Sequence, residues 1–330
     1  MSSIVGIIAN PASGRDIRRL VAHASVFDNN EKVNILQRAL LAMDAIGVEQ
    51  VLMMPDSYAM GERALDGLRL SSLKADLLDT PMTSTEGDST VAAKRLSELN
   101  VGAIIVLGGD GTNRVVAKGC GDVPIVSIST GTNNVFSTMV EGTVAGMAAG
   151  LVALQIVDVD QVSYRAKRLE ISINHEIEDI ALVDVVTTTD LWVGTRAIWD
   201  PSHIQEVVLA RAEPGSIGLS SLGSCFQTVG AHDQEGMYLS LGEGGAHIMA
   251  PLGPGLLTSV AVREHRALHI GEEVRLTQNA GTIALDGERS IELYHQPQVR
   301  VRLTDKGPRV LDIRRCLREA ANMGFFCRLA

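Results

Sequence analysis

The residues with the clearest potential for chemistry are Gly108-Gly109-Asp110-Gly111-Thr112, which follow the apolar run Ile104–Leu107. Glycines let a backbone approach an anion closely, and the first N–H groups of a following helix can point at phosphate oxygens. An aspartate in such a loop repels phosphate unless it binds Mg²⁺ or accepts a proton from an attacking hydroxyl. The segment therefore predicts a phosphate-binding turn in which Asp110 is the reactive group.

The same residues allow a simpler interpretation, because Asp-Gly between two apolar runs is also a hairpin signal. A hairpin requires alternating polar and apolar residues after the turn, and residues 113–118 show no alternation. Residues 112–118 instead resemble the first turns of a helix. We therefore favour a strand–turn–helix unit over a hairpin or a plain connection.

Two other glycine-bearing loops follow predicted strands. Asn10-Pro11-Ala12-Ser13-Gly14 follows the apolar run 4–9, and Ser129-Thr130-Gly131-Thr132-Asn133-Asn134 follows residues 123–128. In open α/β sheets, ligands bind beyond the carboxyl ends of the strands. If the three strands are neighbours, their loops should converge on one crevice.

The first half of the chain alternates between predicted strands and predicted helices. The expected strands are 4–9, 50–54, 75–78, 102–107 and 123–128. The expected helices are 30–46, 57–68, 89–99 and 112–118, with Gly47 ending the first, Ser57 capping the second and Asp88 or Ser89 capping the third. This order is typical of a parallel sheet with helices on both faces.

After about Val162 the pattern changes to short alternating runs, such as 168–173, 273–276 and 299–303, which are typical of half-exposed antiparallel strands. Glycines are frequent between Gly215 and Gly255, as in the turns of a β-rich domain. We predict an α/β nucleotide-binding domain over residues 1–161 and a mostly β domain over residues 162–304, for substrate binding or oligomerisation. Residues 305–330 should return to the first domain, with a helix over 311–323.

Composition limits the partners. The 330 residues include 29 Lys and Arg against 39 Asp and Glu, a formal net charge of −10, and only 3% are aromatic. Such a chain is a poor candidate for binding nucleic acid or an anionic membrane. The four cysteines form no C-x-x-C pair, so we expect reduced thiols. No signal peptide or membrane-length apolar span is recognised, and we expect a cytoplasmic protein.

The glycine segment 108–112 resembles the signature of the superfamily that holds NAD kinases, diacylglycerol kinases and sphingosine kinases. Residues 10–14 resemble the lipid-kinase N-P-x-S-G turn, 131–134 the G-T-x-N segment, and Leu285-Asp286-Gly287-Glu288 a late D-G-E motif. Residues 250–257 are similar to a β-domain stretch of NAD kinases. The resemblance spans most of the chain and is greatest to the NAD-kinase-like branch named for acetoin catabolism protein X.

This resemblance implies an ATP- and Mg²⁺-dependent kinase that phosphorylates a hydroxyl of NAD or a related small molecule. Asp110 would accept the hydroxyl proton or hold a Mg²⁺-bound water, and Asp184, Asp286 and Glu288 would contact the substrate, the metal or the phosphates. A homo-oligomer is also implied. The residues that would bind the nucleotide are Asn10, Ser13, Gly14, Gly108, Gly109, Gly111, Thr112, Thr130, Gly131, Thr132, Asn133 and Asn134.

One departure from the family pattern concerns the acceptor. NAD kinases carry an N-E or N-D pair followed by a basic residue, and residues 181–189 occupy that place here. The acid remains as Asp184, but Val183 replaces the asparagine and the basic residue is missing. Because valine cannot donate an amide hydrogen bond, a site built for NAD is altered.

Several alternatives stay open at this stage. The acceptor could be another small alcohol linked to acetoin metabolism, or a lipid; the donor could be ATP or polyphosphate; and the protein could be a nucleotide-binding regulator without turnover. Arg15 and Arg114 could balance a γ-phosphate, although a solvated surface charge is favoured for each. Asp286-Gly287 could be a hairpin turn as well as part of a site. The features assigned a structural role are the polar loop at His232, Asp233 and Glu235, and Trp192 and Trp199, expected in the core.

Overall fold

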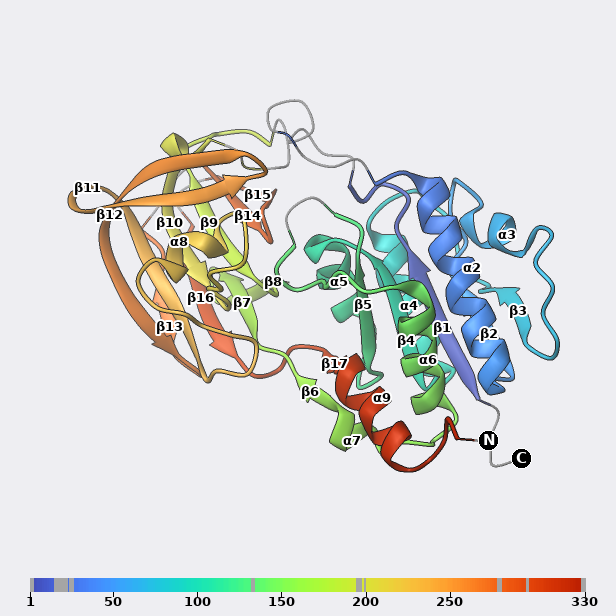
Figure 1. Cartoon of the computed structure of the whole chain (residues 1–330). Helices are drawn as coiled ribbons and strands as arrows, with labels where there is room; N and C mark the ends of the chain where they lie inside the picture. The colour runs from blue at the N-terminus through green and yellow to red at the C-terminus, as the bar shows by residue number, and fades with distance from the viewer. Residues whose placement is uncertain are drawn as a thin grey trace.

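A computed structural model describes residues 3–14, 23, 27–131, 134–193, 198, 200–277, 281–294 and 297–327 of the chain. It consists of an α/β domain and a β domain placed side by side (Figure 1). Among the described residues, no helix combines the length and the apolar character needed to cross a membrane.

A seven-stranded sheet with the order β3-β2-β1-β4-β5-β17-β6 forms the centre of the first domain. Every pair of neighbouring strands in this sheet is parallel except the pair of β17 and β6, which is antiparallel. Strands β1 and β4 are apolar and almost wholly buried, as expected for central strands covered on both faces. The strands are β1 (Ile4–Ala9), β2 (Gln50–Met53), β3 (Lys74–Leu77), β4 (Ala103–Gly108), β5 (Ile125–Ser129), β6 (Ser163–Arg165) and β17 (Arg309–Leu311).

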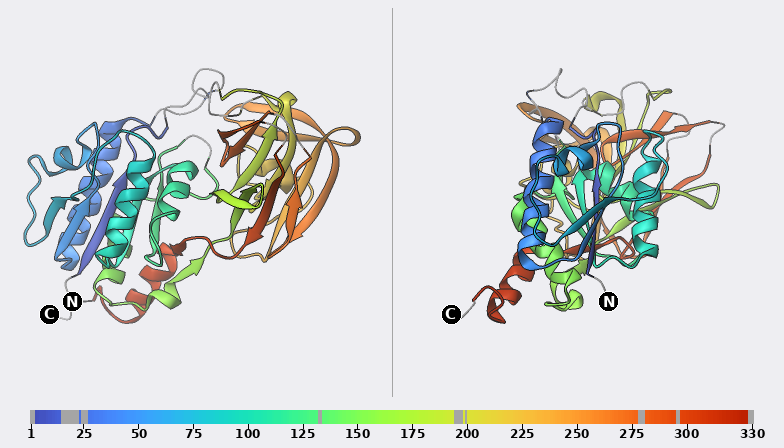
Figure 2. Two further views of the ribbon diagram at one scale, coloured as in Figure 1. Left: turned by 180° about the vertical axis from the view of Figure 1, so that it is seen from behind. Right: turned by 90° about the vertical axis from the view of Figure 1, so that its right-hand side faces the viewer.

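Helices cover both faces of this sheet, and a separate hydrophobic cluster lies under each layer (Figure 2). On one face lie α2 (Asn29–Ile46), α3 (Met60–Leu65), α6 (Gly142–Ala153) and α9 (Ile313–Asn322); on the other lie α4 (Gly87–Glu98) and α5 (Asp110–Ala117). A short helix, α7 (Val159–Val162), leads into β6. The predicted parallel α/β architecture is confirmed.

Two of the predicted helix starts are wrong in detail. Helix α3 begins at Met60 rather than near Ser57, because the carboxylate of Asp56 accepts the N–H groups of Tyr58 and Met60. Helix α4 begins at Gly87, and Asp88 accepts the N–H groups of the preceding loop instead of capping the helix.

Helix α6 was not predicted at all. Its residues are small or apolar on every side, so they show no helical periodicity. The small residues allow α6 to pack closely on α2: a Cβ at Gly146 would lie 2.6 Å from the carbonyl oxygen of Ala39.

The second domain consists of two antiparallel sheets that share a hydrophobic core. The larger has the order β12-β11-β10-β9-β14-β15, and the smaller β13-β16-β7-β8. The strands are β7 (Arg168–Ile173), β8 (Glu176–Ala181), β9 (Asp184–Thr188), β10 (Ile204–Leu209), β11 (Glu235–Gly253), β12 (Leu256–His269), β13 (Glu273–Arg275), β14 (Gly281–Leu285), β15 (Glu288–Leu293) and β16 (Val299–Thr304). The predicted mostly β domain is confirmed.

The chain crosses between the domains twice, from β6 to β7 and from β16 to β17 (Figure 1). After the second crossing, β17 joins the first sheet and α9 packs on α6. The thiol of Cys316 on α9 lies 3.6 Å from the carbonyl oxygen of Ala148. The predicted return of the C-terminal helix to the first domain is therefore confirmed.

Candidate functional site

The three glycine-bearing loops meet in one place because β1, β4 and β5 are neighbours in the sheet. Asn10 Nδ2 donates a hydrogen bond to Thr112 Oγ1 at 2.9 Å. The hydroxyl groups of Ser13 and Thr130 lie 2.8 Å apart. The predicted convergence is confirmed, and hydrogen bonds between side chains hold the loops together.

The glycines of the central loop are required by this crowding. A Cβ at Gly108 would lie 2.4 Å from Thr112 Cβ, and one at Gly109 would lie 3.1 Å from Asn134 Oδ1. Across the domain boundary, a Cβ at Gly111 would lie 3.7 Å from Glu288 Oε2. Thr112 and Asn134 therefore pack against the central loop, and Gly111 faces the carboxylate of Glu288.

A fully buried lysine supports the first loop from behind. Lys32 Nζ on α2 donates to the carbonyl oxygens of Asn10 at 2.8 Å and Ser13 at 2.9 Å, and to Asn29 Oδ1 at 3.1 Å. Lys32 is not among the site residues predicted from the sequence. A signal was present, because Lys32 shares the helical face of Leu36, which is buried.

Asp110 lies in the first turn of α5, and its carboxylate is buried. Oδ2 accepts the N–H of Val135 at 2.8 Å, while Oδ1 accepts those of Phe136 at 3.1 Å and Ser137 at 3.0 Å. Burial raises the pKa of Asp110, and the three N–H groups together with the charge of Arg211 oppose that rise. Asp110 therefore fixes the segment that follows the third loop.

Arg211, which follows β10, reaches the same segment from the second domain. Its Nη1 donates to the carbonyl oxygen of Val135 at 3.2 Å, and its guanidinium lies 4.8 Å from the centre of the Phe136 ring. Arg211 is buried and was missed by the sequence analysis, because no local pattern distinguishes a single arginine in a β-rich region. It connects the environment of Asp110 to the second domain.

Asp286 occupies the turn between β14 and β15 with a left-handed φ of 52°. Its Oδ1 accepts the N–H groups of Leu182 at 2.9 Å and Val183 at 2.8 Å, and Asp184 Oδ1 accepts the N–H of Gly287 at 3.0 Å. The predicted hairpin turn is confirmed, and this turn places Asp286 in the site. Val183, the residue that departs from the NAD-kinase pattern, buries its side chain and contributes only its backbone.

The two oxygens of Asp286 differ. Oδ2 is buried and accepts no hydrogen bond from the described residues. Arg114 Nε lies 3.8 Å from it. Burial raises the pKa of Asp286 to about 7; the positive charge of Arg114 opposes the rise, and the negative charge of Asp110 adds to it.

The expectation of a solvated charge is wrong for Arg114, whose side chain is only 2% exposed. The buried face of α5 turns it towards β8, where its Nη1 lies 3.0 Å from Asp179 Oδ2. Arg15 lies outside the described residues, as do Thr132 and Asn133 of the nucleotide-binding set.

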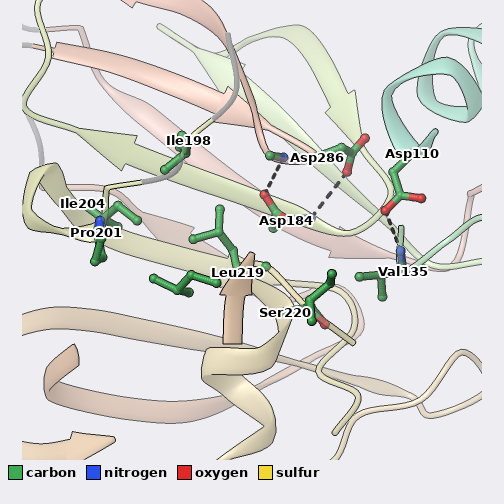
Figure 3. A pocket seen from close by; sticks show the side chains of 13 residues that line it. Asp110, Val135, Asp184, Ile198, Pro201, Ile204, Leu219, Ser220 and Asp286 are labelled. Carbon is green, nitrogen blue, oxygen red and sulfur yellow. Dashed lines mark hydrogen bonds between the residues drawn. The ribbon is translucent and has the colours of Figure 1, made fainter. Parts of the chain in front are cut away.

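A pocket lies beside these carboxylates. Figure 3 shows Asp110, Asp184 and Asp286 at one end of it, with Ile198, Pro201, Ile204 and Leu219 along the other side. Three lining residues, all acids, were predicted from the sequence. The pocket is lined by Asp110, Val135, Asp184, Ile198, Pro201, Ile204, Ile217, Gly218, Leu219, Ser220, Leu252, Asp286 and Gly287.

The structural assignments made from the sequence have mixed outcomes. In the loop near His232, Asp233 accepts the N–H of Gly230, and the His232 ring packs edge-on against Tyr164. No cluster of three or more His, Cys, Asp or Glu within the described ranges could hold a metal ion. Trp192 is 67% exposed, so its predicted core position is wrong, and Trp199 lies outside the described residues.

Known proteins resemble both domains. Residues 5–156 match the ATP-NAD kinase N-terminal domain, and residues 167–306 match the acetoin catabolism protein X C-terminal domain. The solved structure of yeast NADH kinase complexed with NADH has a TM-score of 0.53 and 13% sequence identity, covering 100% of this chain and 89% of that chain. This similarity shows a common fold.

A curated relative shows the family. Acetoin catabolism protein X of Cupriavidus necator is 40% identical over 335 residues, an alignment that covers 97% of this chain and 93% of that protein. This alignment and the two domain-family matches all refer to related proteins, and together they cover both domains of the fold. The chain therefore belongs to the acetoin catabolism protein X family.

Proposed function

We propose that this protein is a kinase that binds the phosphates of ATP at the three glycine-bearing loops and phosphorylates a hydroxyl of an acceptor in the adjoining pocket. The observation that carries this proposal is the joining of three strand-end loops, by the Asn10–Thr112 and Ser13–Thr130 hydrogen bonds, beside a pocket with buried carboxylates. Phosphoryl transfer mainly requires positioning, which the joined loops would supply, and charge neutralisation, which a bound Mg²⁺ would supply.

The loop geometry fits the phosphates of a nucleotide. Gly109 caps the start of α5, and the N–H groups at the start of a helix can bind an anion. Glu288, which faces Gly111, and the phosphate oxygens would hold Mg²⁺, since this ion usually takes few ligands from the protein. When bound, Mg²⁺ would neutralise charge on the transferring phosphoryl group.

The contacts of the two buried acids suggest different roles. Both oxygens of Asp110 already accept backbone N–H groups, whereas Oδ2 of Asp286 accepts none from the described residues. We assign the acceptor's proton to Asp286 Oδ2. Asp110, the proton acceptor expected from the sequence, would instead position the segment that closes the site.

Two kinds of molecule are candidates for the phosphoryl acceptor. NAD is the first, because the fold is shared with yeast NADH kinase, whose solved structure contains NADH. A small alcohol is the second, because Val183 places an apolar side chain in the core where the family resemblance expects an amide.

Turnover of purified full-length protein with ATP and Mg²⁺ tests the proposal. ADP release and ³¹P NMR should show a phosphorylated acceptor from a panel that includes NAD, small alcohols and diacylglycerol in vesicles. Gly108→Ala should abolish ATP binding, because its Cβ would meet Thr112. Gly87→Ala is the matched control, since its Cβ would approach only the Thr85 hydroxyl, at 3.4 Å. ATP binding without transfer to any acceptor would refute the kinase and indicate a regulator.

A further inference from the structure

The pocket beside the carboxylates has an unusual chemical lining. Its lining includes seven apolar side chains and three acids, with the acids at one end. Among its described lining residues there is no lysine, arginine, histidine, amide or aromatic side chain. The apolar set is Val135, Ile198, Pro201, Ile204, Ile217, Leu219 and Leu252.

Hydrogen-bond donors for a bound phosphate are scarce in this lining. Ser220 has the only side-chain donor among the described lining residues, and its hydroxyl already donates to the carbonyl oxygen of Arg211 at 2.8 Å. The N–H of Gly218 donates to the carbonyl oxygen of Pro251, and that of Gly287 donates to Asp184. A pyrophosphate needs cations or free donors when it leaves water, and no lining side chain here offers either.

The three acids at the pocket end do not need a positively charged ligand to balance their charge. Behind the pocket end, the buried guanidinium of Arg114 lies near Asp286, and that of Arg211 acts on Asp110. The third acid, Asp184, accepts the N–H of Gly287. The protein itself thus offsets much of the negative charge, and the opposite wall is apolar.

One buried polar atom next to the pocket lacks a hydrogen bond within the described residues. Asp286 Oδ2 belongs to a side chain that is 0% exposed, and it receives no hydrogen bond within the described part of the chain. An unsatisfied buried acceptor is costly, and a ligand hydroxyl would satisfy it. The pocket therefore fits a ligand that donates a hydrogen bond at one end and is apolar along its length.

We propose that the acceptor is a small, uncharged aliphatic alcohol whose hydroxyl donates to Asp286 Oδ2 and whose carbon chain lies against Ile204, Ile217 and Leu219. On this proposal NAD, the other acceptor considered above, is not the ligand, because its pyrophosphate would find no cation or free side-chain donor in the described lining. As a phosphoryl acceptor, this ligand rests on the proposed kinase function. During transfer the alcohol oxygen bonds to the γ-phosphorus, the bond from that phosphorus to the β–γ bridging oxygen breaks, ADP leaves, and the hydroxyl proton passes to Asp286 Oδ2.

Binding can be measured without turnover, which separates this inference from the kinase proposal. Saturation-transfer NMR on the full chain would use propane-1,2-diol, pentane-1,2-diol and NAD as probes. The diols should bind, with the longer one binding more tightly because it covers more apolar wall. Ile217→Trp should weaken diol binding by at least about tenfold by filling the pocket, since one good hydrophobic contact is worth about that factor.

A matched control shows whether the effect is local. Ile177→Trp makes the same change at an exposed position of β8 and should leave diol binding unchanged. Both variants should bind ATP as the unmodified protein does. Failure of both diols to bind would overturn the inference, as would NAD binding that Ile217→Trp removes. Diol binding without any ADP release would leave the pocket assignment standing and refute the kinase.

Discussion

Arg114 Nε lies 3.8 Å from Asp286 Oδ2, and the two side chains are 2% and 0% exposed. Arg114 belongs to α5 in the first domain, whereas Asp286 belongs to the β14–β15 turn of the second. The same guanidinium pairs with Asp179 on β8. A single buried arginine therefore joins the helix that carries Asp110 to two parts of the β domain.

Replacing this arginine should destabilise the protein. Arg114→Met leaves Asp286 without its buried cation, whereas Asp179 keeps its ion pair with Lys118 at 2.6 Å. Removing one partner of a buried ion pair costs about 3–5 kcal/mol. The free energy of unfolding, from urea denaturation followed by circular dichroism, should fall by about that amount. Arg114→Lys keeps the charge and should lose less. Equal stability of Arg114→Met and the unmodified protein would contradict the role assigned to the ion pair.

The pKa of about 7 at Asp286 predicts a pH dependence of turnover. If Asp286 Oδ2 accepts the hydroxyl proton, the ionised form is the active one, so kcat should rise as the pH rises through about 7. Asp286→Asn keeps an oxygen for the N–H groups of Leu182 and Val183 but loses the proton acceptor. This variant should lose most of the activity, and its remaining kcat should no longer rise with pH.

Stability provides an independent check on the same group. Its folded-state pKa lies above its usual value of 3.8, so the folded protein binds more protons than the unfolded chain between about pH 4 and pH 7. The contribution of Asp286 to stability should therefore decrease as the pH rises across this window. The stability difference between the unmodified protein and Asp286→Asn should change accordingly in urea denaturation. A difference that is constant with pH would argue against the raised pKa.

The sequence was sufficient to predict the meeting of the loops and the acids that line the pocket. Each glycine loop follows an apolar run, so strand alternation alone places all three at one sheet edge, and Asp286 sits in a recognisable Asp-Gly turn. Lys32, Arg114 and Arg211 could not be assigned in this way. Their roles depend on partners distant in sequence, such as Ser13, Asp179 and Val135, which only the tertiary structure brings within reach.

The apolar wall of the pocket was equally hidden from the sequence. Ile204, Ile217 and Leu252 come from a strand, a loop and the end of a hairpin, and each resembles an ordinary core residue. Nothing in their local patterns distinguishes a wall of a pocket from the interior of a sandwich. The sequence alone could therefore not determine the class of acceptor. That class is inferred from the residues that the fold brings together around the pocket.

Asp110→Asn should loosen the segment that follows the third loop. An asparagine has one side-chain oxygen for three N–H donors, so at least one of Val135, Phe136 and Ser137 loses its acceptor. Hydrogen exchange of residues 135–137 should become faster, and turnover should fall by about 100-fold through misplacement of the site.

Asp233→Asn is a suitable control for this variant. Asp233 also accepts a backbone N–H, from Gly230, but it lies in a polar loop that does not line the pocket. It should leave both hydrogen exchange at 135–137 and turnover unchanged. Normal turnover in Asp110→Asn, with unaltered exchange at 135–137, would remove Asp110 from the proposed mechanism.

Lys167 should make stability rise with pH. Burial, assisted by the charge of Arg211, lowers the pKa of Lys167 from 10.5 to about 8, while Nζ donates to the carbonyl oxygen of Gly230 at 3.0 Å. Between about pH 8 and pH 10.5 the unfolded chain binds the extra proton, so stability increases with pH over this window. The advantage of the unmodified protein over Lys167→Met should grow by about 3 kcal/mol across it. An advantage that shrinks with rising pH would have the wrong sign for a lowered pKa.

Lys32 should be needed for nucleotide binding although it is fully buried. Its ammonium group draws the carbonyl oxygens of Asn10 and Ser13 towards α2 and so fixes the loop that Ser13 joins to Thr130. Lys32→Met removes these donors and leaves buried carbonyl oxygens unpaired, at a cost of about 1–3 kcal/mol for each. The loop should relax, and the Kd for ATP, measured by isothermal titration calorimetry, should rise by at least about tenfold, the factor that 1.4 kcal/mol represents.

Lys94→Met, on the exposed side of α4, makes the same chemical change away from the loops and should leave the Kd for ATP unchanged. Diol binding should persist in both variants, because Lys32 does not line the acceptor pocket. An unchanged Kd for ATP in Lys32→Met would mean that the 10–14 loop does not bind the nucleotide.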